Sequence, residues 1–164
     1  MTGKLKLVSL AIAGVAALVL SGCVDTSMLY RGNQVSPVHV VTLQESGPNA
    51  GTWQTFDLVV DYQYTRNGDA FDISAEAELG QHQQRLYARL QYLYFYFFFV
   101  DKDSRVLETF SIDNFYAGKT DERVKFSKSY KIPNGAEGFS FGYSGNVIEQ
   151  QSHMSFYLLP LSKQ

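Results

Sequence analysis

The chain's three histidines are its most obvious candidates for holding a metal or moving a proton. His39, His82 and His153 lie far apart in the sequence, and no two of them have the short spacing of a zinc motif. Only proximity in the folded chain could turn one of them into a catalytic base. We therefore expect surface or core histidines, no metal site and no cofactor.

Other residue types that carry chemistry also lack a motif. The sequence has no Gly-x-Ser-x-Gly elbow and no Gly-rich loop of the phosphate-binding kind. Asp101 and Asp103 are spaced like the start of a calcium loop, but no Gly follows at the sixth position and no Glu at the twelfth. A solvated hairpin turn is the favoured interpretation there. These absences favour a non-enzymatic protein.

The only cysteine, Cys23, follows a segment that is typical of a secretory signal. Lys4 and Lys6 precede an apolar run from Leu7 to Leu20, and the small pair Ser21-Gly22 comes next. The run has about 14 residues, roughly 21 Å as a helix, whereas spanning ~30 Å of hydrocarbon takes ~20 residues. The segment therefore predicts a cleaved signal and not a membrane-spanning helix.

The sequence Leu20-Ser21-Gly22-Cys23 resembles the lipobox of bacterial lipoproteins. The resemblance covers residues 1–23 alone. It implies that Cys23 receives a diacylglyceryl group, that the peptide before it is removed, and that the new amino terminus is acylated, for example with palmitate. Two or three acyl chains hold a protein durably on a membrane. A lone Cys also leaves an exported protein without an internal disulfide.

The residue after Cys23 bears on which membrane holds the protein. In the sorting rule of enterobacterial lipoproteins, an Asp directly after the Cys favours retention at the inner membrane. Val24 occupies that place here, and the Asp comes one position later, at Asp25. The resemblance therefore implies delivery to the outer membrane of a bacterial envelope, on either its periplasmic or its surface leaflet.

A stripe of tyrosines is the one other feature that could be functional. Tyr92, Tyr94 and Tyr96 share one side of a predicted strand, and tyrosine offers a large apolar area with a polar tip. Packing in the core or on a sheet face is the favoured interpretation. A protein-binding face comes next, followed by a platform for carbohydrate or another small ligand.

The elements that must position these residues have a period of two. Apolar residues alternate with polar ones over Phe56 to Tyr64 and again over Phe71 to Leu79. Between these segments, Asn67-Gly68 predicts a hairpin with the two positive φ angles of a type I′ turn. Val38 to Leu43 is predicted as a first strand, and the turn-rich stretch from Glu45 to Gly51 ends it.

The second half of the chain continues this pattern. Gly80 to Leu90 predicts a loop or a single turn, and Tyr92 to Val100 predicts a strand that is buried on both faces. Lys128 interrupts the apolar side of a later strand, which indicates a bulge or an edge of the sheet. Ser144-Gly145-Asn146 is predicted as a turn before a final strand from Met154 to Leu161.

These elements together predict an all-β domain. Seven or eight short strands without a useful helical period favour an antiparallel β-sandwich. The pattern resembles immunoglobulin-like or transthyretin-like lipoprotein domains in architecture alone, because the Cys and Trp hallmarks of true immunoglobulin domains are missing. We expect residues 1–22 to be the signal peptide, residues 23–37 the lipidated Cys and a flexible tether, and residues 38–164 one domain.

Composition excludes several functional classes. The chain is 45% hydrophobic and 18% charged, with a net charge of −2, so neither long disorder nor binding to nucleic acid is expected. Two hypotheses remain. The first is a membrane-anchored, non-enzymatic envelope lipoprotein with a structural or protein-binding role, whose partner would be another envelope protein. The alternative is a periplasmic hydrolase or a small-ligand or carbohydrate-binding module.

Overall fold

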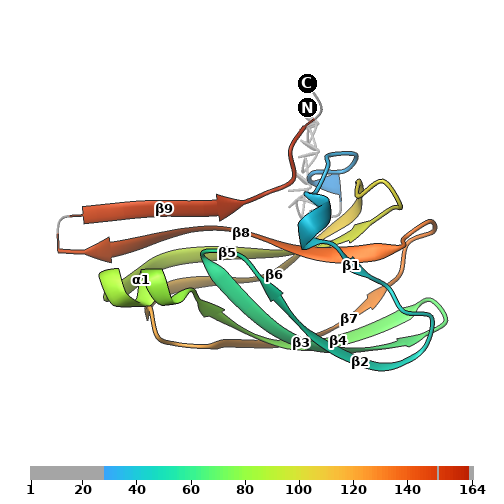
Figure 1. Ribbon diagram of the computed structural model, residues 1–164, viewed down its shortest axis with the longest axis horizontal. Coiled ribbons are helices and arrows are strands. Elements are labelled where there is room, and N and C mark those ends of the chain that lie inside the picture. Colours follow the sequence, from blue (N-terminus) through green and yellow to red (C-terminus); the bar gives the residue numbers. More distant parts are fainter. Residues whose placement is uncertain (1–27, 151, 163–164) are drawn as a thin grey trace, which may run out of the picture.

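The computed structural model describes residues 28–150 and 152–162, so the predicted signal peptide and Cys23 lie outside the described residues. Within these ranges two antiparallel sheets face each other (Figure 1), and the predicted antiparallel β-sandwich is confirmed. The elements are β1 (Val41–Thr42), β2 (Gly47–Gln54), β3 (Leu58–Asn67), β4 (Ala70–Leu79), α1 (Gln81–Leu86), β5 (Arg89–Val100), β6 (Val106–Lys119), β7 (Val124–Lys131), β8 (Gly138–Glu149) and β9 (Ser152–Leu158).

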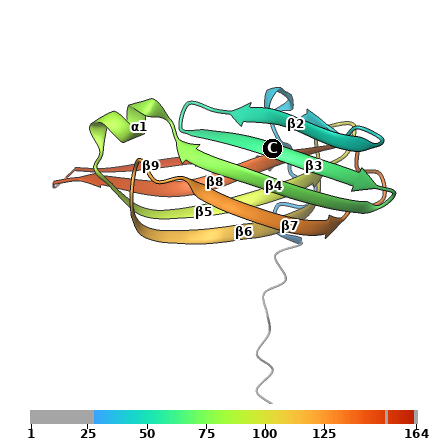
Figure 2. The same ribbon diagram turned by 90° about the horizontal axis from the view of Figure 1, so that it is seen from below.

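One sheet contains five strands and the other four. In the five-stranded sheet the order is β1-β8-β5-β6, and β9 lies beside β8 on the same edge as β1. The four-stranded sheet has the order β2-β3-β4-β7 and lies over the other sheet in Figure 2. No helix in the described ranges is long and apolar enough to cross a membrane.

The predicted hairpin is present, but its turn differs in detail. Strands β3 and β4 pair from Leu58↔Leu79 to Asn67↔Ala70, so Gly68 and Asp69 are the two turn residues. Only Gly68 has a positive φ, at 63°. A glycine at the first central position fits a type II′ turn, so the predicted type I′ turn, which needs two positive φ angles, is wrong.

The described residues contain nine strands, more than the seven or eight predicted. Gly47–Gln54, which overlaps the predicted turn, is an edge strand, a position where Pro48 is tolerated because no neighbour needs its missing N–H. Conversely, the predicted first strand from Val38 to Leu43 is reduced to the two-residue β1, because Val38 and His39 belong to a 3-10 turn, Pro37–His39.

The predicted turn at Ser144-Gly145-Asn146 is also wrong. These residues lie within β8 and pair with β9 through Ser144↔Tyr157 to Asn146↔Ser155. Gly145 has a packing reason to be there, because a Cβ at this position would lie 2.4 Å from the Phe156 ring. Gly145 therefore leaves space for the core ring of Phe156, and the strand continues through this position.

The segment predicted as the end of a flexible tether is part of the domain. Val35 is 5% exposed, and its N–H donates to the Ser104 carbonyl at 2.9 Å. Gln34 bonds through its backbone to Leu161 in both directions. The prediction of little order is wrong for this part of residues 23–37, because a few apolar side chains in turns can pack on a sheet without showing any period.

The core between the sheets is dominated by aromatic rings. Phe97 is fully buried at its centre, and its ring lies 5.0 to 5.7 Å from five others. These are the rings of Phe71, Phe99, Tyr130, Phe139 and Phe141. The rings come from both sheets, so this cluster holds the two layers together by burial of apolar area and by edge and stacking contacts.

Tyr130 makes the core sensitive to alkaline pH. Its ring stacks on Phe97, its hydroxyl has no hydrogen-bond partner among the described residues, and burial raises its pKa to about 12. In the unfolded chain a tyrosine ionises near pH 10. Between about pH 10 and 12 the folded state therefore binds more protons than the unfolded state, and the free energy of unfolding falls as pH rises.

We expect Tyr130→Phe to reduce this alkaline loss of stability while leaving stability at pH 7 unchanged or slightly higher. The measurement is the denaturation midpoint of both proteins from pH 8 to 12. Other buried tyrosines keep part of the pH dependence in the variant. Parallel curves for the two proteins would contradict the assignment to Tyr130.

Candidate functional site

Strand β5 shows different side chains on its two faces. Phe95, Phe97 and Phe99 are fully buried against the four-stranded sheet. Tyr92, Tyr94 and Tyr96 lie on the opposite, outer side and are each half-buried. The prediction that both faces are buried is therefore right only near the end of the strand, where Phe98 and Val100 are also covered.

Pairing in the five-stranded sheet extends the tyrosine stripe into a wider surface. Tyr92 lies directly opposite Tyr116 on β6, and Tyr94 lies opposite Ser144 on β8, which in turn faces Tyr157 on β9. Directly paired residues in antiparallel strands point to the same side of a sheet. We call the surface formed by Tyr92, Tyr94, Tyr96, Tyr116 and Tyr157 the tyrosine face.

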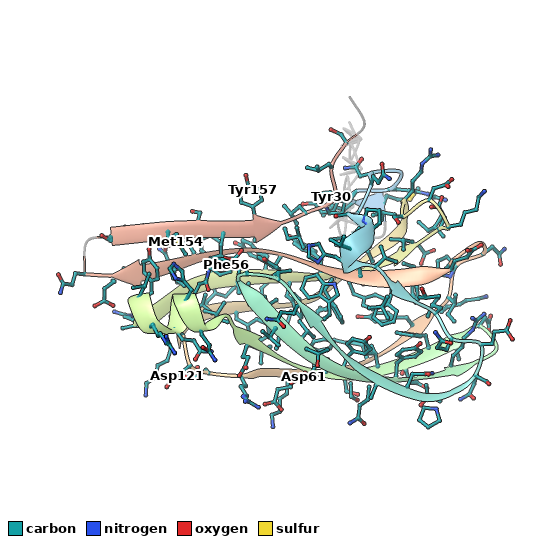
Figure 3. All side chains as sticks on the ribbon, in the orientation of Figure 1. Tyr30, Phe56, Asp61, Asp121, Met154 and Tyr157 are labelled. Atoms are coloured by element: carbon teal, nitrogen blue, oxygen red, sulfur yellow. The ribbon has the colours of Figure 1, made fainter. Side chains whose placement is uncertain are left out.

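Some rings of the tyrosine face pack against one another, and others are largely exposed to solvent. Tyr94 packs against Tyr92 at 5.2 Å between ring centroids and edge-on against Tyr116 at 6.1 Å. Tyr116 and Tyr157 are 61% and 71% exposed, and Figure 3 shows the Tyr157 side chain pointing away from the sandwich. Large exposed aromatic side chains that are partly held in place suit contact with another molecule.

The amino-terminal segment covers one end of this face. Tyr30 has a positive φ of 63°, a conformation that is uncommon for a bulky residue, and its ring packs edge-on against Tyr96 and Phe98. Thr109 donates a hydrogen bond to the Leu29 carbonyl. These contacts fix the point at which the chain reaches the domain on the outer side of the five-stranded sheet (Figure 1).

A small apolar cavity lies beside Tyr157 at the same end. Its volume is about 150 Å³, and its lining includes Val35, Phe98, Leu158 and Leu161. An apolar cavity of roughly this size can hold a benzene-sized group. Leu161 is 74% exposed at its border. The cavity could therefore receive one apolar side chain from a bound molecule.

Two hydroxyl groups of this face, those of Tyr96 and Tyr116, have a pKa above the ordinary value and stay protonated at neutral pH. Burial, with smaller contributions from Tyr30 and Tyr94, raises the pKa of Tyr96. A long hydrogen bond of 3.5 Å to the Tyr94 hydroxyl raises the pKa of Tyr116. Neutral phenols donate and accept hydrogen bonds but are poor nucleophiles, so this arrangement suits recognition rather than covalent catalysis.

The outer side of the four-stranded sheet has the opposite character. Arg123 lies 2.8 Å from Glu76 and 2.9 Å from Glu78, and Lys125 lies 3.2 Å from Glu76. We call this outer surface the charged face, and Figure 3 shows Asp61 on it. By contrast, the residues that pair with the tyrosine stripe carry no charge; they are Tyr116, Asn114 and Ser111 on β6, and Asn146, Ser144 and Gly142 on β8.

A broad depression of about 850 Å³ lies on the charged face, but its carboxylates already have partners. Asp61 accepts a hydrogen bond from Thr52 at 2.6 Å. Hydrogen bonds from Arg123 and Lys125 hold the pKa of Glu76 below its ordinary value. A carboxylate that is kept ionised and paired is a poor general acid, so Glu76 is a poor candidate for that role.

A buried polar network under α1 is the other notable cluster. The Asp57 carboxylate accepts hydrogen bonds from the Tyr143 hydroxyl, at 3.0 Å, and from the Gln83 amide. Burial raises the pKa of Tyr143. The alternation over Phe56 to Tyr64 places Asp57 on the polar side of its segment, but the fully buried Gln83 brings α1 over it. The network ties α1 to β3 and β8 and so closes one end of the sandwich.

The histidines remain apart in space. His39 lies against Trp53 and His82 against Phe56, whereas His153 lies on β9. Among residues 28–150 and 152–162, no three His, Cys, Asp or Glu side chains gather as a metal site.

The sequence pattern predicts three residues of the tyrosine face, Tyr92, Tyr94 and Tyr96, but not Tyr116 and Tyr157. Tyr116 and Tyr157 belong to strands whose pairing partners are set by long-range contacts, so no local spacing connects them to Tyr92. In the sequence, the only indication for each of these two residues is a large tyrosine at a strand position that alternation assigns to the outer side. Comparison with known proteins finds no matching family model, no matching curated protein and no matching solved structure.

Proposed function

We propose that this protein is a non-enzymatic lipoprotein of the bacterial envelope that binds another envelope protein through its tyrosine face. The observation that carries the proposal is the contrast between the two outer surfaces. One bears five tyrosines, has no charged residue at the positions that pair directly with Tyr92, Tyr94 and Tyr96, and adjoins an apolar cavity, whereas the other carries a cluster of ion pairs. Tyrosine-rich, charge-poor surfaces with a pocket are typical of the centres of protein interfaces.

The place where the segment around Met28 and Tyr30 joins the domain supports an orientation of the tyrosine face toward the membrane. Only four residues separate Cys23 from Met28, so a lipidated Cys23 would lie within about 18 Å of Met28 even in a fully extended chain. Tyr30 lies on the tyrosine face. An anchor at Cys23 would therefore keep this face close to the membrane surface, where the partner would have to be within reach.

Site-specific photocrosslinking tests the binding face. A benzophenone amino acid at position 94 or 116 of the full chain should capture a discrete protein band in native membranes. The matched control is position 63, because Gln63 is exposed on the charged face. Equal capture from all three positions would contradict a dedicated face. Binding of a saccharide with no captured protein would instead favour the ligand-binding alternative.

Substitution of Tyr116 provides the quantitative test. We expect Tyr116→Ala to weaken partner binding by about 5- to 30-fold, the usual loss when a central interface tyrosine is truncated. Because Tyr116 is 61% exposed, the melting temperature should change little. Recovery of the partner in a pull-down, measured beside the melting temperature, separates the two effects. Unchanged recovery with a lowered melting temperature would mean that Tyr116 is structural.

A further inference from the structure

Three of the four long edge strands of the sandwich carry features that hinder pairing with another strand. Strand β2 contains Pro48, which has no N–H to donate. Strand β7 carries Lys125, Lys128 and Lys131, and Lys128 stands on its inward side as predicted for an edge. Strand β6 has two irregularities of register against β5, opposite Phe95/Tyr96 and Phe99/Val100.

The fourth edge, β9, has none of these features. Its seven residues include no Asp, Glu, Lys, Arg, Pro or Gly. It pairs with β8 in one unbroken register from Tyr143↔Leu158 to Glu149↔Ser152. Within the part of the chain that the structure describes, β9 makes no backbone hydrogen bond except with β8. Its outer row of N–H and C=O groups is therefore available to another strand.

We propose that β9 pairs with β9 of a second copy of this chain, antiparallel and about a two-fold axis at Ser155. This register places Met154 opposite Phe156 and His153 opposite Tyr157. Phe156 belongs to the core and Met154 packs against it, so this pairing would join the two cores. A small residue stands on the axis, and no like charges meet across it.

The side of the sheet on which the amino-terminal segment lies favours a second copy of this chain as the partner of β9. The two-fold axis of an antiparallel pair is perpendicular to the sheet, so both tyrosine faces would lie on the same side. The amino-terminal segment of each copy also lies on that side, as shown by the packing of Tyr30 on Tyr96 (Figure 1). Both chains would then reach one membrane together. This step rests on the proposed anchoring. The pairing of the two β9 strands does not rest on it.

Cysteine crosslinking in membranes tests the pairing. In the full chain, Ser155→Cys should give a disulfide-linked dimer under mild oxidation, because directly opposed residues in antiparallel strands lie within disulfide range. The matched control is Ser111→Cys, since Ser111 is also exposed but lies on β6, at the opposite edge of the same sheet. Any dimer formed through Cys23 would appear in both variants and in the parent protein.

We expect at least about fivefold more dimer from Ser155→Cys than from Ser111→Cys. In a second measurement, Ser155→Lys should raise the dimer dissociation constant of the detergent-extracted full chain by roughly fivefold, because like charges would face each other across the axis. Ser111→Lys should leave it unchanged. Fluorescence of Trp53, which is 3% exposed, reports whether each variant is folded.

Two results would overturn the pairing. One is an equal yield of dimer from positions 155 and 111, and the other is a crosslink from position 155 to a different protein only. Neither depends on the partner captured at positions 94 and 116. Failure of the dimer and failure of the proposed function can therefore be told apart.

Discussion

Phe97→Ala is expected to lower the free energy of unfolding by about 3 to 5 kcal/mol, which is a large fraction of the stability of a typical domain. Phe97 is fully buried, and its ring contacts aromatic rings from both sheets. Truncation removes these contacts and leaves a cavity that the rigid strands around it can close only in part. Denaturation followed by the fluorescence of the single Trp, Trp53, measures the loss.

The matched comparison comes from the same strand. Tyr94→Ala removes a ring of similar size from the outer face, where Tyr94 is only half-buried. We expect it to cost clearly less than Phe97→Ala, and Phe97→Leu to fall between the two because it keeps most of the buried volume. If Tyr94→Ala destabilises the protein as much as Phe97→Ala, the tyrosine face is a packing surface and the proposed binding role is wrong.

The proposed lipidation of Cys23 predicts that Cys23→Ser abolishes lipid attachment entirely. Formation of the thioether needs a thiolate, and the hydroxyl of Ser is a poor substitute at neutral pH. The variant should remain an unprocessed precursor held by its signal or, if another peptidase acts, become a soluble exported form. Metabolic labelling with palmitate, together with membrane fractionation, measures both changes.

A conservative change beside the cysteine provides the control for this experiment. Ser21→Ala keeps the thiol and a small residue in the lipobox-like sequence, so its labelling should match that of the parent protein. Palmitate incorporation into Cys23→Ser would rule out the lipoprotein interpretation. The proposed orientation of the tyrosine face toward a membrane would then lose its support as well.

Patterns within short stretches of the sequence were enough to predict several local features of this protein. Alternation over residues 56–64 and 71–79 predicted two strands, and Asn67-Gly68 located the hairpin between them. The parity of Tyr92, Tyr94 and Tyr96 placed them together on one side of their strand, as the structure confirms. These features depend on a period of two and on backbone preferences of single residues, which act within a few residues of the chain.

Which side of β5 faces the core depends on contacts between segments that are distant in the sequence. Both parities of this strand are aromatic, so alternation could not distinguish Phe97 from Tyr96. The choice depends on β8, β6 and the opposite sheet, all distant in sequence, and the outer side is only partly covered, by residues such as Tyr30. Burial is a property of such long-range contacts, and no local pattern records it.

The same reason explains the errors and the missed residues. Gly145 looked like part of a turn because its need for space comes from Phe156, which reaches it only across the β8–β9 pair. Tyr116 and Tyr157 joined the tyrosine face through strand pairings that bring distant segments side by side. The sequence therefore determined where strands and turns form in most places, whereas the order of the strands decided which side chains share a surface.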